Sequence, residues 1–342
     1  MKLAVVLFNL GGPDSPQAIE PFLRNLFTDP AIIALPALLR MPLGRLIARR
    51  RAPVAHEIYA KIGGRSPIVE ETQAQAAALE RALAVRGHKA RCFIAMRYWK
   101  PFSDEAARAV KAWAPDRIVL LPLYPQYSTT TTASSLAAWK AAAKQAGLNA
   151  ATSRICCYPH EKGFIEAEAA LIREAFARAR PGISYRLLLS AHGLPKRTVA
   201  RGDPYQWQVE RTAASIVEAL GIAALDYTVC YQSRVGPLEW IGPATDTEIR
   251  RAGNEGKGVV VAPIAFVSEH SETLVELDIE YERLAKETGV ADYIRAPALS
   301  TRSEFIEGLA GLVERALSHQ IASCGDGRIC PADMRACGWG AR

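Results

Sequence analysis

The sequence lacks the features that would place the chain in a special class of protein. No run of apolar residues approaches the ~18 to 20 that a membrane-spanning helix requires, and residues 1–8 have a short apolar run without the small-residue cleavage site of a signal peptide. The net charge is small: 42 Lys and Arg against 35 Asp and Glu give a formal charge of +7. A charge of this size does not by itself imply nucleic-acid binding. With 49% hydrophobic residues among 342, the composition is that of a globular protein of about two domains. We therefore expect a cytoplasmic protein that does not bind nucleic acid.

Glycine-rich phosphate loops are also missing. Residues 10–13 follow the first apolar run but do not have the G-x-G-x-x-G spacing, and residues 62–67 follow no clear strand. Neither segment contains the Lys and Ser or Thr of a phosphate loop. The sequence therefore disfavours nucleotide binding.

The residues that are present alternate between short apolar runs and longer segments with helical spacing. Continuous apolar strands that alternate with amphipathic helices are typical of a parallel sheet covered on both faces, so we predict a doubly wound α/β fold. The expected strands are 3–10, 92–96, 117–122, 186–190, 227–231 and 259–266, and the expected helices include 71–85, 104–113, 134–146 and 165–179.

Two of these segments resemble each other and indicate a duplication. Residues 117–124 and 258–266 are both hydrophobic, have a proline near the end, and precede a polar loop and a helix. We predict two similar domains, 1–155 and 156–320, with a cleft between them and a tail at 321–342. Because ligands of open α/β sheets bind beyond the carboxyl ends of the strands, the polar loops are where we expect the site.

One expected strand places a histidine at its carboxyl end. His192 follows Leu-Leu-Leu-Ser-Ala, and Gly193 and Pro195 turn the chain directly after it. An imidazole there can act as a base or as a metal ligand near neutral pH. A single histidine in this position also fits a purely structural role.

A second expected strand end leads into a helix with a row of carboxylates. Glu272, Glu276 and Glu280 are spaced by four residues, so they share one helix face at its N-terminal half. Carboxylates that begin in the cleft loop could receive protons or guide a divalent cation. The alternative is a solvated acidic stripe that favours the helix dipole.

Taken together, the segments resemble the ferrochelatases, which insert ferrous iron into a porphyrin. The resemblance runs in order over nearly all of residues 3–320 and implies two Rossmann-like domains around a deep cleft. Its motifs are LFNLGGP at 7–13, IGGRSPI at 62–68, MRYW at 96–99, YPQYS at 124–128, SAHGLP at 190–195, YQSRVGP at 231–237, WIGP at 240–243 and the helix at 272–281.

The resemblance also implies roles for single residues. His192 corresponds to the family's active-site histidine, which is either the base that takes the pyrrole protons or a ligand of the substrate iron. Glu272 corresponds to its acidic partner, also a candidate iron ligand, and Glu276 continues the carboxylate row. His270 matches another pocket histidine. The residues that match the lining of the porphyrin cavity are Arg97, Tyr98, Tyr124, Ser128 and Trp240.

The same resemblance implies a role for an apolar segment at 31–47, which we call the lip. It includes Ile33 and is followed by a basic cluster that comprises Arg45 and residues 49–51. The composition alone fits either a core helix with a solvated basic end or a segment that contacts anionic lipid. In the family this segment forms the hydrophobic mouth of the site. We expect peripheral contact with the inner face of the cell membrane and protoporphyrin IX as the substrate.

The seven cysteines are an odd number and do not indicate a disulfide framework. Some ferrochelatases hold a [2Fe–2S] cluster on four cysteines, and a bacterial variant uses one internal cysteine with three in the tail. Cys324, Cys330 and Cys337 fit that count, with Cys157 or Cys156 as the fourth ligand. The alternative is a disordered tail with free thiols.

Two other functions remain open at this point. The chain could insert another metal, such as cobalt, or use another tetrapyrrole such as coproporphyrin. It could also be a haem or porphyrin carrier, which would need His192 as an axial ligand but would not need the carboxylate row. The sequence does not indicate an oligomeric state.

Overall fold

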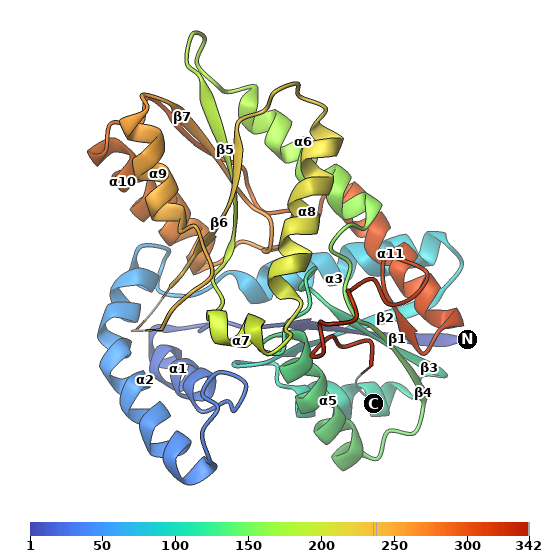
Figure 1. The fold of residues 1–342 in the computed structure, drawn as a ribbon. Coiled ribbons are helices and arrows are strands. Elements are labelled where there is room, and N and C mark those ends of the chain that lie inside the picture. Colours follow the sequence, from blue (N-terminus) through green and yellow to red (C-terminus); the bar gives the residue numbers. More distant parts are fainter. Residues whose placement is uncertain (235, 237, 341–342) are drawn as a thin grey trace.

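The computed structural model describes residues 1–234, 236 and 238–340, and it forms two parallel sheets with helices around them (Figure 1). Positions 235 and 237 of the motif at 231–237 lie outside the described residues. The strands are β1 (Lys2–Asn9), β2 (Lys89–Met96), β3 (Arg117–Pro122), β4 (Ala151–Ile155), β5 (Tyr185–His192), β6 (Tyr227–Gln232), β7 (Gly258–Pro263), β8 (Tyr293–Arg295) and β9 (Ile321–Ala322).

The helices between these strands agree with the predicted α/β alternation. They are η1 (Pro16–Ala18), α1 (Ile19–Phe27), α2 (Ala37–Ala60), α3 (Ile68–Val85), α4 (Ser103–Trp113), α5 (Thr132–Ala146), α6 (Lys162–Phe176), α7 (Lys196–Ala200), α8 (Tyr205–Leu220), α9 (Thr245–Asn254), η2 (Glu272–Tyr281), α10 (Glu282–Glu287) and α11 (Ser303–Ser318). The strand expected at 259–266 is shorter than predicted. It ends at Pro263, which has no N–H to donate to a sheet ladder.

The two sheets share one topology, which supports the predicted duplication. The first sheet has the strand order β2-β1-β3-β4-β9 and the second has β6-β5-β7-β8, and all neighbouring strands are parallel. In the second sheet the order reverses between β5 and β7. The loops at the carboxyl ends of these two strands therefore lie at a topological switch point, where ligands bind in this class of fold.

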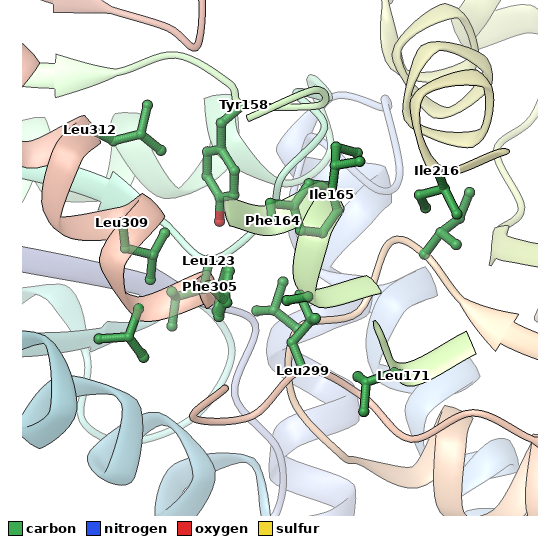
Figure 2. Close-up of a cluster of buried hydrophobic side chains, with 14 of the residues drawn as sticks. Leu123, Tyr158, Phe164, Ile165, Leu171, Ile216, Leu299, Phe305, Leu309 and Leu312 are labelled. Atoms are coloured by element: carbon green, nitrogen blue, oxygen red, sulfur yellow. The ribbon is translucent and has the colours of Figure 1, made fainter. Parts of the chain in front are cut away.

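The core is continuous between the two sheets. Side chains of β1 alternate, so that Leu3, Val5 and Leu7 face this shared core while the residues between them face α4 and α5. Figure 2 shows part of the shared core, in which Phe164 of α6 and Phe305 of α11 lie close together, with ring centroids 6.3 Å apart. Helices α3, α6, α8 and α11 contribute side chains to this same core, so the two sheets share it.

The tail begins as part of the first sheet. Strand β9 pairs with β4 through Arg154 and Ile321 and through Ile155 and Ala322. After β9 the chain has no further helix or strand up to residue 340, and in Figure 1 it lies near β4 and α5.

The lip forms the turn after α1 and the first half of α2, at the lower left of Figure 1. Helix α2 packs on α1 through small residues, Gly44, Ala48 and Ala52, and leaves its leucines outside. Leu38 is 89% exposed and Leu39 is 60% exposed. No helix in the described part of the chain combines the length and apolarity needed to cross a membrane.

Candidate active site

The structure places His192 and Glu272 in direct contact. His192 is the last residue of β5, and Glu272 begins η2 after the loop that follows β7. Because β5 and β7 are neighbours, the two side chains meet beyond the carboxyl edge of the sheet, with 2.8 Å between His192 Nδ1 and Glu272 Oε2. The histidine side chain is 41% exposed and the glutamate is 29% exposed, so the pair is open to a ligand.

Two residues at the end of β6 hold the carboxylates in place. Ser233 Oγ lies 3.1 Å from Glu272 Oε2 and 2.5 Å from Glu276 Oε2, within hydrogen-bond distance of both, and the backbone N–H of Ser233 donates to Glu276 Oε1 at 2.8 Å. Gln232 Nε2 donates to the Glu272 carbonyl at 2.9 Å. Ser233 has a φ of 60°, a left-handed conformation that costs energy for a residue with a side chain. The strain places one hydroxyl between both carboxylates.

The charges of these groups push their pKa values in different directions. Burial disfavours the imidazolium of His192, but the charge and hydrogen bond of Glu272 outweigh it, so the pKa of His192 is raised above its ordinary value. Burial also opposes ionisation of Glu272, yet His192 and His270 lower the pKa of Glu272 to about 2. Burial and the charge of Glu272 raise the pKa of Glu276. Carboxyls whose pKa values are separated in this way can take different roles in acid–base chemistry.

His270 completes the group of side chains around Glu272. Its Nδ1 lies 3.1 Å from the Ser268 carbonyl oxygen, and its Nε2 lies 4.0 Å from Glu272 Oε2. The ring also packs against Phe266, with centroids 4.8 Å apart. The structure thus brings together four of the predicted site residues, which are His192, His270, Glu272 and Glu276.

The helix that bears the carboxylates is a π-helix, whereas the spacing indicated an ordinary α-helix. It runs from Glu272 to Tyr281 and continues as α10. Wide helical turns of this kind are rare and are frequent at functional sites. Glu280 differs from the other two members of the row, because it pairs with Lys61 at 3.2 Å and is exposed.

Tyr59 belongs to this site and was not identified from the sequence. It lies near the end of α2 in the first half of the chain, and its hydroxyl is 3.5 Å from Ser271 Oγ. Burial and the charge of Glu272 raise the pKa of Tyr59 to about 12, although its hydrogen bond to Ser271 opposes them. No local pattern marks this tyrosine, since its partners are more than two hundred positions away.

Arg97 and Tyr98 lie in a separate cluster around a buried carboxylate, Asp29. Asp29 Oδ2 accepts from Arg97 Nη2 at 2.7 Å, from the Tyr98 hydroxyl at 2.9 Å and from Ser134 Oγ at 2.6 Å. Asp29 also contacts the start of the lip, because its Oδ1 accepts from the backbone N–H of Ala31 at 2.8 Å. This cluster attaches the lip to the first sheet.

The remaining predicted cavity residues are distributed around these two clusters. Tyr124 is buried with its hydroxyl 3.5 Å from Ser135, Ser128 is buried and donates to Asp203 at 3.0 Å, and Ile33 is half-buried in the lip. Trp240 lies next to Gly193, where an added Cβ would be 3.2 Å from its ring. Its buried indole N–H has no hydrogen-bond partner in the described structure.

Four cysteines form a second group, the thiol cluster, which consists of Cys156, Cys157, Cys330 and Cys337. Cys156 and Cys330 are each within hydrogen-bond contact of both Cys157 and Cys337. All four are buried, whereas Cys324 makes no such contact and packs against the main core. The thiols touch one another closely, and across the described residues no three His, Cys, Asp or Glu side chains are arranged to hold a metal ion.

The chain is similar over nearly its whole length to known proteins. The family model described as Ferrochelatase matches residues 2–317. A ferrochelatase of Caulobacter vibrioides is 57% identical over 340 residues, which are 98% of this chain and 97% of that protein. One from Phenylobacterium zucineum is 56% identical over 339 residues and 98% of each chain. SirB from Bacillus subtilis, solved with Fe³⁺, has a TM-score of 0.54 at 13% identity over 92% of this chain and 96% of that one, which shows the fold alone.

Proposed function

This chain belongs to the ferrochelatase family, and from that membership we propose that its porphyrin substrate is protoporphyrin IX and that His192 is its proton acceptor. The enzyme inserts iron into a porphyrin. The observation that carries the proposed role is the 2.8 Å contact between His192 Nδ1 and Glu272 Oε2 at the switch point of the second sheet.

The reaction needs a base because a free-base porphyrin has two pyrrole N–H groups inside its ring. When His192 is neutral, its Nδ1–H donates to the Glu272 carboxylate, and the lone pair on Nε2 is available to take a pyrrole proton. The imidazolium that forms is then stabilised by the adjacent carboxylate. Imidazole and carboxylate also bind Fe²⁺ less firmly than a set of thiolates, which suits a metal that must be released into the ring.

Glu276 is the proposed acceptor of the protons that leave the His192–Glu272 pair. Its raised pKa makes it the carboxyl that holds a proton more readily than Glu272. Ser233 Oγ lies between the two carboxylates and can relay a proton from one to the other. The Tyr281 hydroxyl donates to Glu276 Oε1 at 2.9 Å and continues the chain of hydrogen bonds away from the cleft.

An anaerobic insertion assay tests the substrate and separates an enzyme from a carrier. The purified chain is offered Fe²⁺, Zn²⁺ or Co²⁺ with protoporphyrin IX or with coproporphyrin, and product is followed by its absorbance. We expect the highest kcat/KM with Fe²⁺ and protoporphyrin IX. A preference for coproporphyrin would contradict the proposed substrate, and tight porphyrin binding without turnover would indicate a carrier.

We further propose that the lip rests on an anionic membrane surface. The exposed leucines of α2 would enter the acyl boundary, and the exposed arginines that follow would meet the lipid headgroups, each worth about 1 kcal/mol. Protoporphyrin IX has two propionates where coproporphyrin has four, so it is the substrate that a membrane would hold.

Vesicle sedimentation checks this contact. We expect the wild type to bind vesicles with anionic lipid and to dissociate at high salt. The double variant Leu38→Glu and Leu39→Glu should bind at least about tenfold more weakly, because two leucines that would enter the acyl boundary are lost. Val85→Glu is the matched control, since Val85 is 90% exposed on α3 outside the lip. Equal binding by all three proteins would contradict the proposal.

We also propose that the thiol cluster holds a [2Fe–2S] cluster. Four thiolates satisfy such a group, and the tail contributes two of them while the segment after β4 contributes the others. When bound, the cluster would supply a redox-active cross-link between the tail and the first sheet. We assign the fourth ligand to Cys156 because it touches Cys337, which Cys324 does not.

Electron paramagnetic resonance of reduced protein purified without oxygen tests this assignment. We expect a [2Fe–2S] signal in the wild type, its loss in Cys156→Ser and its retention in Cys324→Ser. Loss of the signal in Cys324→Ser and its retention in Cys156→Ser would show that Cys324, and not Cys156, is the fourth ligand of the cluster. A wild type without iron and without a signal would leave the tail with free thiols.

A further inference from the structure

A buried amide makes hydrogen bonds both to the thiol cluster and to a loop on the active-site side of the molecule. We propose that Gln208 is a positioning residue that couples the state of the thiol cluster to the β3–α5 loop, residues 123–131. The loop contains Tyr124 and Ser128, so the functional meaning of this coupling rests on the proposed porphyrin site.

The contacts of Gln208 reach both groups at once. Its Oε1 accepts the backbone N–H of Tyr127 at 2.8 Å, and its Nε2 donates to Cys330 Sγ at 3.0 Å and to Cys157 Sγ at 3.4 Å. The side chain is completely buried at the start of α8. Because no water reaches it, a shift of the two sulfur atoms must either move the amide or leave its N–H groups without a partner.

A second contact ties the same two regions together next to Gln208. The backbone N–H of Ala336, adjacent to Cys337, donates to the Gly202 carbonyl at 3.1 Å. The following residue, Asp203, accepts from Ser128 Oγ at 3.0 Å and from the backbone N–H of Thr129 at 2.7 Å. Two hydrogen-bonded contacts therefore join the tail to the support of this loop, and Gln208 is the one that reaches the thiols. Tyr127 of the loop also packs directly against Cys156 and Cys157.

The β3–α5 loop continues to the catalytic strand ends. Gln126 Nε2 donates to the Ile264 carbonyl at 3.1 Å, and the N–H of Ile264 donates to the Ser190 carbonyl at 2.9 Å. Ile264 directly follows β7, and Ser190 lies two residues before His192 on β5. A displacement of the loop thus reaches both strands that place the His192–Glu272 pair.

The test is a double-mutant comparison in the full-length chain, with Cys330→Ala as the change in the thiol cluster. Amide hydrogen exchange of residues 123–131 is measured in the wild type, Cys330→Ala, Gln208→Leu and the double variant, together with KM for the porphyrin and kcat. Exchange needs neither porphyrin nor iron, so it reports on the coupling even where the proposed substrate is wrong.

We expect Cys330→Ala to speed exchange of residues 123–131 about tenfold and to raise KM several-fold while kcat changes less. In the Gln208→Leu background it should add nothing further. Gln208→Glu should keep the loop protected, because a carboxylate still accepts from Tyr127, but should make it insensitive to Cys330→Ala. Gln206→Leu is the control on the same helix, since its side chain contacts Glu210 instead. Independent, additive effects of Cys330→Ala and Gln208→Leu would overturn the proposal.

Discussion

Replacing Glu272 or His192 with alanine is expected to lower the rate of iron insertion by about 10² to 10⁴ while porphyrin binding stays detectable. The reason is the same for both variants. Without His192 there is no imidazole to accept the pyrrole proton, and without Glu272 the imidazole loses the carboxylate that orients its Nδ1–H and stabilises its charge. The measurement is anaerobic single-turnover insertion, with porphyrin binding followed separately by fluorescence.

The control for this pair is Glu282→Ala. Glu282 lies on α10, just beyond the π-helix, and forms an exposed ion pair with Lys286 at 2.8 Å, so its removal should change the rate by less than about twofold. Wild-type activity in Glu272→Ala would contradict the proposed role of the pair.

The same contact determines how His192 titrates. Burial lowers the pKa of His192 and Glu272 raises it, and the net effect is upward. The neutral form of His192 therefore becomes abundant only at a pH above the ordinary pKa of histidine. Glu272→Gln removes the charge and keeps the size of the side chain. We therefore expect the midpoint of His192, followed by NMR of its ring protons, to move to lower pH in this variant. An unchanged midpoint would show that Glu272 does not act on the histidine.

Asp29→Ala is expected to lower the free energy of unfolding by about 3–5 kcal/mol, the range for breaking a buried ion pair by removing one partner. The carboxylate of Asp29 is 2% exposed and accepts from Arg97, Tyr98 and Ser134. Its loss leaves the half-buried guanidinium of Arg97 without its carboxylate and the buried phenol of Tyr98 without its acceptor. Urea unfolding followed by tryptophan fluorescence measures the change.

Two further variants show whether the carboxylate itself is responsible. Asp29→Asn keeps an acceptor but loses the charge, so its effect should be intermediate. Asp104→Ala breaks an exposed pair with Arg108 and should cost no more than about 0.5 kcal/mol. If Asp29→Ala proved as mild as Asp104→Ala, the buried cluster would contribute little to the attachment of the lip.

The helix with Glu272 and Glu276 shows which structural features the sequence can predict and which it cannot. The spacing of Glu272 and Glu276 correctly indicated that both carboxylates lie on one side of a helix. The same spacing is compatible with an α-helix and with a π-helix, because the choice depends on which carbonyl each N–H meets. In the folded chain the helix is a π-helix, and Ser233, directly after β6, contacts both carboxylates.

The cysteines show the same division. Their number and their position in the tail predicted a group of thiols, but neither indicates which thiols meet. Cys324 is nearer in sequence to Cys330 than Cys156 is, yet the pairing of β9 with β4 brings the chain after Cys324 back to Cys156. Sequence separation carries no information about such a contact.

The amino-acid pattern alone predicted the α/β architecture, the similarity of the two halves and a histidine at a strand end, because the spacing of apolar residues reflects which sides of each strand and helix are buried. The tertiary structure alone decided that Tyr59 lies near Glu272, that Ser233 takes a left-handed backbone, and that Gln208 bridges the tail and the β3–α5 loop. Each of these depends on a partner many residues away, and only the packing of the whole chain brings such partners together.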